Sequence, residues 1–195
     1  NKNKKKSLFA NKLIDLIKNE FWKIQKNFSP ECSNLLFFGS YIYIIFINLA
    51  NIEMNKNYEQ LSIKVGFMKH NGGLLFKEIS KNEYEFKTTI KENHLNASGI
   101  THGGYIASII DSGAGTGAHR AASNFPCVTI SLDIKFIGST KLGDEIIGFT
   151  KIQKKTKNLV FLICHLQSKG KIIATASGIW KILNTKPITK SGFGG

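Results

Sequence analysis

The chain has 195 residues and a formal net charge of +14, with 42% hydrophobic and 21% charged residues. This composition is typical of a globular protein, and the length suits one domain with its own core. The lysines are spread along the chain without a nucleic-acid-binding motif, so we expect no nucleic-acid partner, although the charge would attract a polyanionic small molecule. The three cysteines, Cys32, Cys127 and Cys164, have neither metal-binding nor disulfide-framework spacing, so we expect no metal site and a cytoplasmic location.

The first 53 residues differ from the rest of the chain. A basic start is followed by an uncharged hydrophobic run over residues 35–52, which is just long enough to cross a membrane. The basic residues before this run would keep the N-terminus in the cytoplasm and place the remaining chain on the other side. From Met54 onward the pattern becomes orderly. We therefore predict a functional domain over residues 54–195, with residues 1–53 as either a non-native upstream segment or an N-terminal anchor.

The domain is predicted to begin with a short helix and a hairpin. Residues 57–68 carry apolar residues at helical spacing, and Asn71-Gly72-Gly73 suits a glycine C-cap. Two strands are expected next, with Lys81-Asn82 as the turn between them, over residues 74–80 and 84–90.

A second helix is predicted from about Gly103 to Ala121, after a polar loop. Small and apolar residues recur there at spacings of three and four, so one face should be buried. A helix N-terminus has unpaired backbone N–H groups, and glycines such as Gly103 and Gly104 let a ligand oxygen approach them. Asp111 lies two turns further on among small residues, where a carboxylate is costly to desolvate unless it has a partner or a task. In isolation, Asp111 would be interpreted as an acid on the solvent side of the helix, and the motif around it changes this interpretation.

Four more strands are predicted, over residues 128–136, 145–155, 159–167 and 171–183. In the first, Val128, Ile130 and the following apolar residues alternate with Thr129 and Ser131, which predicts a half-buried strand. Residues 159–166 are apolar on both faces, as in a central strand. One buried helix and six strands without βαβ alternation indicate an α+β fold with an antiparallel sheet around the helix.

Six residues match a known signature position for position. The signature is Asn-x-x-Gly-x-x-His-Gly-Gly with an acid nine residues after the His, and its residues here are Asn96, Gly99, His102, Gly103, Gly104 and Asp111. The sequence thus resembles the hot-dog-fold acyl-CoA thioesterases of the phenylacetate-degradation (PaaI-like) family, over roughly residues 72–183. The resemblance implies the hot-dog fold, with a six-stranded antiparallel sheet wrapped around one central helix. It also implies hydrolysis of an aromatic or medium-chain acyl-CoA to free acid and coenzyme A, without a cofactor.

The resemblance assigns catalytic roles along this motif. Asp111 would act as nucleophile or general base, and the Gly103 N–H would stabilise the oxyanion, a contribution of about 3–4 kcal/mol. Asn96 would orient the attacking water or the carbonyl, or else brace its own loop. His102 would fix the loop by hydrogen bonds or act near the thiolate leaving group.

Three further residues are assigned to substrate binding. Gly99 and Gly104 are expected to be conformational, with Gly104 as an alternative second donor. Thr129 would present a hydroxyl to the acid and water, although Ser131 is expected on the same strand face. At the helix C-terminus, His119 and Arg120 are explained by the helix dipole, an interpretation that we prefer to phosphate binding.

In the family, the acid and the helix N-terminus of one site come from different protomers, which implies a homodimer or homotetramer with interfacial sites. A coenzyme A ester is a cytoplasmic substrate, which favours residues 1–53 lying outside the functional protein and makes membrane association unexpected. Three alternatives stay open: a module that binds acyl-CoA without hydrolysis, a hot-dog enoyl-CoA hydratase or dehydratase, and a membrane-anchored protein. The relatives often have Arg-Pro in the turn where Gly138-Ser139 stands here.

Overall fold

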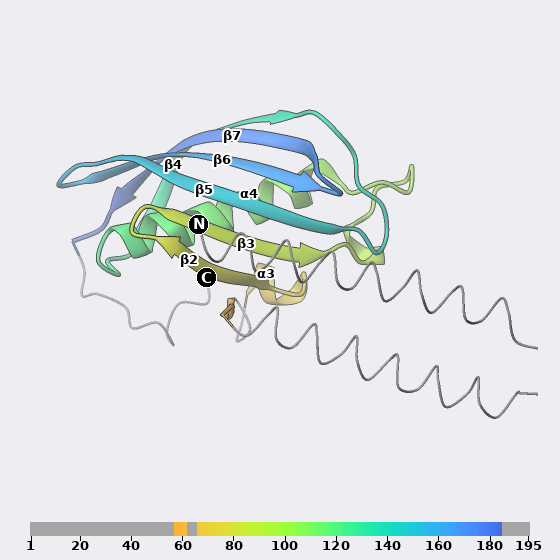
Figure 1. The fold of residues 1–195 in the computed structure, drawn as a ribbon, viewed down its shortest axis with the longest axis horizontal. Helices are drawn as coiled ribbons and strands as arrows, with labels where there is room; N and C mark the ends of the chain where they lie inside the picture. The colour runs from red at the N-terminus through yellow and green to blue at the C-terminus, as the bar shows by residue number, and fades with distance from the viewer. Residues whose placement is uncertain (1–56, 62–65, 185–195) are drawn as a thin grey trace, which may run out of the picture. The chain divides into compact units, whose positions relative to one another are not determined.

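The computed structural model describes residues 57–61 and 66–184 (Figure 1). The predicted boundary at Met54 and the hydrophobic run over residues 35–52 lie outside these ranges. The chain divides after Asn57 into two units, and every element described below belongs to the second unit, which begins at Tyr58. Within the described ranges, no helix is long and apolar enough to cross a membrane.

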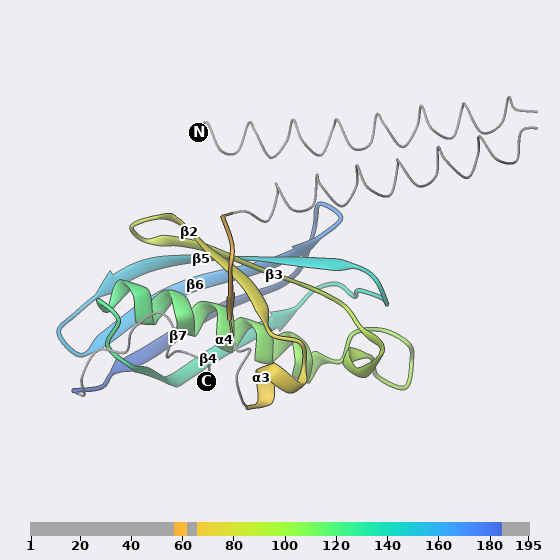
Figure 2. The same cartoon turned by 90° about the horizontal axis from the view of Figure 1, so that it is seen from below.

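The described strands form one seven-stranded antiparallel sheet. The sheet packs on one long helix, as Figures 1 and 2 show. The strand order across the sheet is β1-β2-β3-β5-β6-β7-β4. The long helix is α4 (Gly103–Ala121), and α3 (Phe67–His70) and the 3-10 turn η2 (Glu92–His94) are short. The strands are β1 (Glu59–Leu61), β2 (Leu74–Ser80), β3 (Glu83–Thr89), β4 (Cys127–Phe136), β5 (Glu145–Lys155), β6 (Leu159–Ser168) and β7 (Lys171–Ile182). The predicted α+β hot-dog fold is confirmed, with seven strands in place of six.

The extra strand corrects the prediction for residues 57–68. Glu59–Leu61 pairs with β2 as an antiparallel strand, and helix α3 is limited to four residues. The helical spacing of apolar residues was misleading because Leu61 reaches the core as part of a strand, with 5% of its surface exposed. Pairing with the sheet overrides local helix propensity here. The predicted cap at Asn71-Gly72-Gly73 is present, with φ of +90° at Gly72 and +69° at Gly73.

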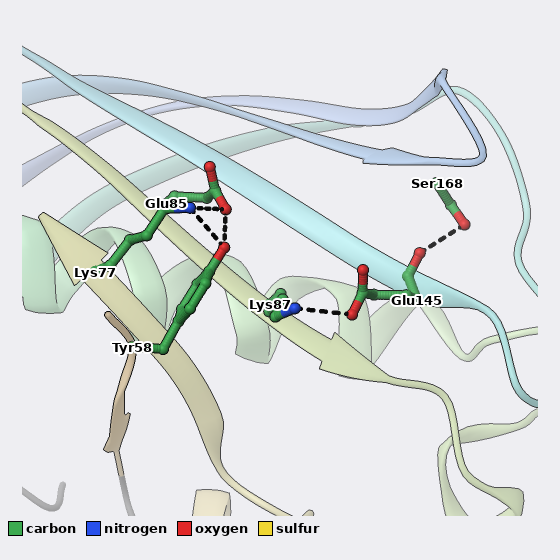
Figure 3. Close-up of polar contacts among 6 residues, drawn as sticks. All are labelled: Tyr58, Lys77, Glu85, Lys87, Glu145 and Ser168. Carbon is green, nitrogen blue, oxygen red and sulfur yellow. Dashed lines mark hydrogen bonds and ion pairs between the residues drawn. The ribbon is translucent and has the colours of Figure 1, made fainter. Parts of the chain in front are cut away.

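Tyr58, which directly precedes β1, contacts side chains of β2 and β3 (Figure 3). Its hydroxyl donates to Glu85 and accepts a hydrogen bond from Lys77 Nζ at 2.8 Å. Its ring lies under the ammonium groups of Lys77 and Lys87, 4.3 and 4.9 Å from the ring centroid. Burial and the neighbouring Glu85 carboxylate raise the pKa of Tyr58. Because Glu85 and Lys87 flank Phe86, which contacts α4, this cluster occupies the face of the sheet opposite the helix.

Small residues on α4 allow the helix to lie close against the sheet. A Cβ at Gly113 would be 2.4 Å from the Phe86 ring, and one at Gly117 would be 2.9 Å from the Tyr84 ring. Both rings are 1% exposed, so the core has no room for larger helix residues at these two positions. The helix is thereby fixed on the sheet, and its position determines where Asp111 lies.

Candidate active site

Asp111 lies on the exposed side of α4, next to the edge strand β4. The Thr129 hydroxyl donates a hydrogen bond to Asp111 Oδ1 at 2.6 Å, a length typical of an O–H group bound to a carboxylate. Among the described residues, Asp111 Oδ2 has no hydrogen-bond partner. The helix and the edge strand therefore bring together two residues that lie 18 positions apart in sequence.

A β-bulge in β4 aims Thr129 at the helix. Thr129 is opposite Trp180 and Ser131 is opposite Ile179, so Ile130 is an extra residue in the strand. Directly opposed residues of an antiparallel pair point to the same face, and Trp180 is buried in the core on the helix side. Thr129 therefore points to the helix side and Ser131 to the opposite face. The expectation that the two share a face is wrong, because the bulge interrupts the alternation, as bulges near active sites often do.

The N-terminus of α4 has a backbone donor that no described residue accepts. His102 is the N-cap, and its Nδ1 accepts a hydrogen bond from the Gly104 N–H at 2.8 Å. The His102 carbonyl accepts from the N–H groups of Tyr105 and Ile106. Within the described part of the chain, this leaves the Gly103 N–H without an acceptor. The structure thus places His102 and Gly104 in the cap and Gly103 at its open position.

The loop before the helix is braced by Asn96. Asn96 Oδ1 accepts from the N–H groups of Ser98 at 2.9 Å and Ile100 at 3.3 Å, which forms an Asx turn. Gly99 has a φ of +71°, in the left-handed region, so its role in this turn is conformational. The Asn96 Nδ2 amide has no acceptor among the described residues and can donate to a ligand.

His94 contacts the first residues of α4 and the residue before them. This structural role was not predicted from the sequence. Its Nδ1 accepts from the Lys91 N–H and its Nε2 donates to the Asn71 carbonyl, both at 3.0 Å. Its ring stacks on Tyr105 with a centroid separation of 3.7 Å, and its own carbonyl accepts from the His102 N–H. Because Nδ1 accepts an N–H group, the ring is in a neutral form, and burial lowers the pKa of His94 in agreement with this. No local spacing marks this residue, because its partners are distant in sequence or are backbone groups.

Phe136 covers one side of the helix N-terminus. It follows the bulge on β4 and is opposite Ala174, a core residue, so it points to the helix side like Thr129. A Cβ at Gly103 would lie 3.6 Å from the Phe136 ring. Nevertheless 59% of the Phe136 surface is exposed. The edge strand therefore carries two contacts to α4, Thr129 at Asp111 and Phe136 at Gly103.

The acid and the open donor are separated along α4. Asp111 follows Gly103 by eight residues, which corresponds to about 12 Å at the helical rise per residue. A carbonyl carbon and its oxygen are adjacent atoms, so this separation is large for Asp111 and the Gly103 N–H of one chain to act together on the same thioester.

His119 and Arg120, at the C-terminal end of α4, are both bonded within the fold. The Arg120 guanidinium pairs with Glu59 Oε1 at 2.7 Å and its side chain is only 6% exposed, so it is engaged within the fold. His119 donates from Nδ1 to the Phe125 carbonyl at 2.8 Å. Across the described ranges, no three His, Cys, Asp or Glu side chains are grouped to hold a metal ion.

Comparisons with known proteins support the family and the fold. The family model described as the thioesterase superfamily matches residues 98–172. A Pseudomonas aeruginosa protein provisionally named an esterase is 31% identical over 94 residues, covering 48% of this chain and 70% of that protein. Acyl-coenzyme A thioesterase 13 of Homo sapiens is 31% identical over 87 residues, covering 44% of this chain and 62% of its own length. The crystal structure of zebrafish thioesterase superfamily member 2 superimposes with a TM-score of 0.58 at 21% identity, covering 63% of this chain and 91% of that one.

Proposed function

The chain belongs to the thioesterase superfamily, and we propose that it hydrolyses an aromatic or medium-chain acyl-coenzyme A to a free acid and coenzyme A. Similarity to acyl-coenzyme A thioesterase 13 supports this substrate class. The observation that carries the proposal is the Asp111 carboxylate held by the Thr129 hydroxyl at the exposed edge of the sheet. A carboxylate with one oxygen fixed and the other open is suited to acid–base or nucleophilic chemistry.

In one route of the proposed reaction, Asp111 Oδ2 accepts a proton from a water whose oxygen bonds to the carbonyl carbon. In the other route, Asp111 Oδ2 itself bonds to the carbonyl carbon, and after the thiolate has left, a water hydrolyses the resulting anhydride to the free acid and the Asp111 carboxylate. The C=O electron pair moves onto oxygen, where the Gly103 N–H at the helix N-terminus stabilises the negative charge. The C–S bond then breaks, and the coenzyme A thiolate leaves and takes up a proton. The Asn96 Nδ2 amide would orient the carbonyl or the water, and His102 would hold the helix N-terminus in shape.

The complete site is proposed to form between two copies of the chain. Strand β4 is one of the two edge strands of the described sheet, and it exposes apolar side chains such as Val128 and Ile130, 44% and 56% exposed. Such an edge is suited to pairing with another strand. An antiparallel pair of β4 strands with a twofold axis near Leu132 would place Thr129 of one protomer near Phe136 of the partner subunit. Asp111 would then face the helix N-terminus of the other copy, which meets the distance requirement in a homodimer or homotetramer.

Thiol release from a panel of acyl-CoA esters by the full chain tests the proposed function. We expect Asp111→Asn to lower kcat/KM by about a hundredfold or more, since it removes the basic group while preserving the side-chain shape. Glu78→Gln is the matched control, because Glu78 is an exposed acid on β2, which lies far from β4 in the strand order. If the wild type binds the esters without releasing thiol, the chain is a binding module. If it instead hydrates an enoyl-CoA, it is a hydratase.

A further inference from the structure

We infer that Phe136 is a specificity-determining residue that contacts the acyl group next to the thioester carbonyl and favours an aryl-acyl group over acetyl. The inference rests on the proposed function and adds to it the part of the substrate that this side chain recognises. It places acyl selection on the edge strand at the helix N-terminus.

The Phe136 ring has one covered side and one open side. The covered side lies against Gly103. A Cβ atom added to Gly103 would be 3.6 Å from Phe136 Cε1 and 3.7 Å from Cζ. Elsewhere the ring is open, so that 59% of the residue is exposed. On the same strand face, Leu132 and Ile134 pack against the core. Phe136 thus extends the apolar face of β4 beyond the core, up to the open N–H group of Gly103.

This position brings the ring next to a bound carbonyl. An oxygen that accepts from the Gly103 N–H lies close to Gly103 Cα. A Cβ on that Cα would be in van der Waals contact with the Phe136 ring. The carbon atoms attached to that carbonyl must then pass close to Phe136. Since Gly103 has no side chain, nothing at this residue separates the ligand from the ring.

The chemistry of the ring selects which part of the substrate it contacts. The pantetheine arm of coenzyme A carries amide groups that need hydrogen-bond partners, and a phenyl ring provides none. An apolar acyl group gains dispersion contacts with the ring, and an aryl group can also stack against it. The acetyl group has a single methyl and gains least. Phe136 should therefore discriminate among acyl groups according to their size and aromaticity.

The test compares kcat/KM of the full chain on phenylacetyl-CoA, octanoyl-CoA and acetyl-CoA for the wild type, Phe136→Ala and Phe136→Leu. In Phe136→Ala we expect the preference for phenylacetyl-CoA over acetyl-CoA to fall by about tenfold, the usual range for a lost apolar contact. Phe136→Leu should keep most of the activity on octanoyl-CoA and lose the aryl preference. Ile137→Ala is the matched control, because Ile137 is the next residue and is 60% exposed.

The outcomes separate this inference from the proposed function. An equal loss of kcat/KM on all three esters would assign Phe136 to the coenzyme A portion and overturn the inference, as would an unchanged preference. A shift of the same size in Ile137→Ala would also overturn it, since the effect would not be specific to the ring. If the wild type releases no thiol from any ester, the proposed function fails, and the inference fails with it. Circular dichroism and Tm of each variant check that the exposed substitutions leave the fold unchanged.

Discussion

At the scale of single residues, the Thr129 hydroxyl is the partner that fixes the Asp111 carboxylate. A hydrogen bond to a charged group contributes about 1.5–3 kcal/mol, so we expect Thr129→Val to lower kcat by about ten- to a hundredfold with little change in Tm. Steady-state kinetics on the preferred ester measure the effect. Ser131→Ala is the control, because Ser131 lies two residues along β4 but on the opposite face. Equal losses in the two variants would contradict the role of the bulge.

The motif residues could be predicted from the sequence, but their contacts could be predicted only in part. Asn96, His102 and Gly103 stand at defined positions around a helix start, and capping rules are local enough to suggest what each can do. The bulge at Ile130 follows no local signal, because it depends on the register between β4 and β7. The position of Phe136 beside Gly103 could not be predicted either, because it depends on how β4 and α4 pack on the core.

At the scale of elements, the N-terminus of α4 rests on the buried His94, whose pKa is lowered from 6.5 mainly by burial and also by the positive charge of Lys91. Below pH 6.5 the unfolded chain binds a proton at His94 that the native state does not, so this part of the stability is complete above pH 6.5 and lost as the pH falls. The same sign holds for His119, whose pKa is also lowered by burial.

We therefore expect Tm to fall as the pH is lowered from about 7.5 to about 5, and the fall to be smaller in His94→Gln than in the wild type. Thermal unfolding followed by circular dichroism across this range measures both slopes. Tyr105→Phe is the control, because it keeps the ring stacked on His94 and removes only the hydroxyl bonded to Thr88. A slope in His94→Gln as steep as in the wild type would show that His94 does not contribute.

Most elements could be predicted because their patterns are long and periodic. Helix α4 begins and ends where predicted, at Gly103 and Ala121. Small and apolar residues recur at spacings of three and four along its whole length, which is typical of a helix with one buried face. Strand β5 likewise matches its predicted bounds, Glu145–Lys155. Strand β1 was missed because three residues are too few for an alternating pattern, and its stability depends on contacts far along the chain, such as that of Arg120 with Glu59.

At the scale of the whole molecule, each chain would supply two half-sites to the proposed site, because α4 runs along the edge strand. One half-site is Asp111 with Thr129, and the other is the Gly103 N–H with Phe136. Gly103 and Asp111 of one chain are about 12 Å apart. Pairing of two chains would bring Asp111 of one chain close to the Gly103 N–H of the other. Val128 and Ile130, which are exposed on β4, would be covered by the same pairing.

Removal of the donor can be designed without disturbing the helix. Gly103 is the first residue of α4, a position that favours proline, and His102 has φ −64° and ψ 133°, which a following proline accepts. Gly103→Pro therefore deletes the N–H group, and we expect kcat to fall by about a hundred- to a thousandfold. Gly103→Ala keeps the N–H and adds only a methyl group at ordinary contact distance from Phe136, so its loss should be at least tenfold smaller.

The most direct test is to mix Asp111→Asn with Gly103→Pro, each nearly inactive alone, and to measure thiol release after subunit exchange. If the site combines Asp111 of one chain with Gly103 of another, half of the dimers are mixed and each has one intact site. The mixture should then regain about a quarter of wild-type activity. Activity that stays at the sum of the two variants, although mass spectrometry shows mixed dimers, would contradict a site shared between two copies.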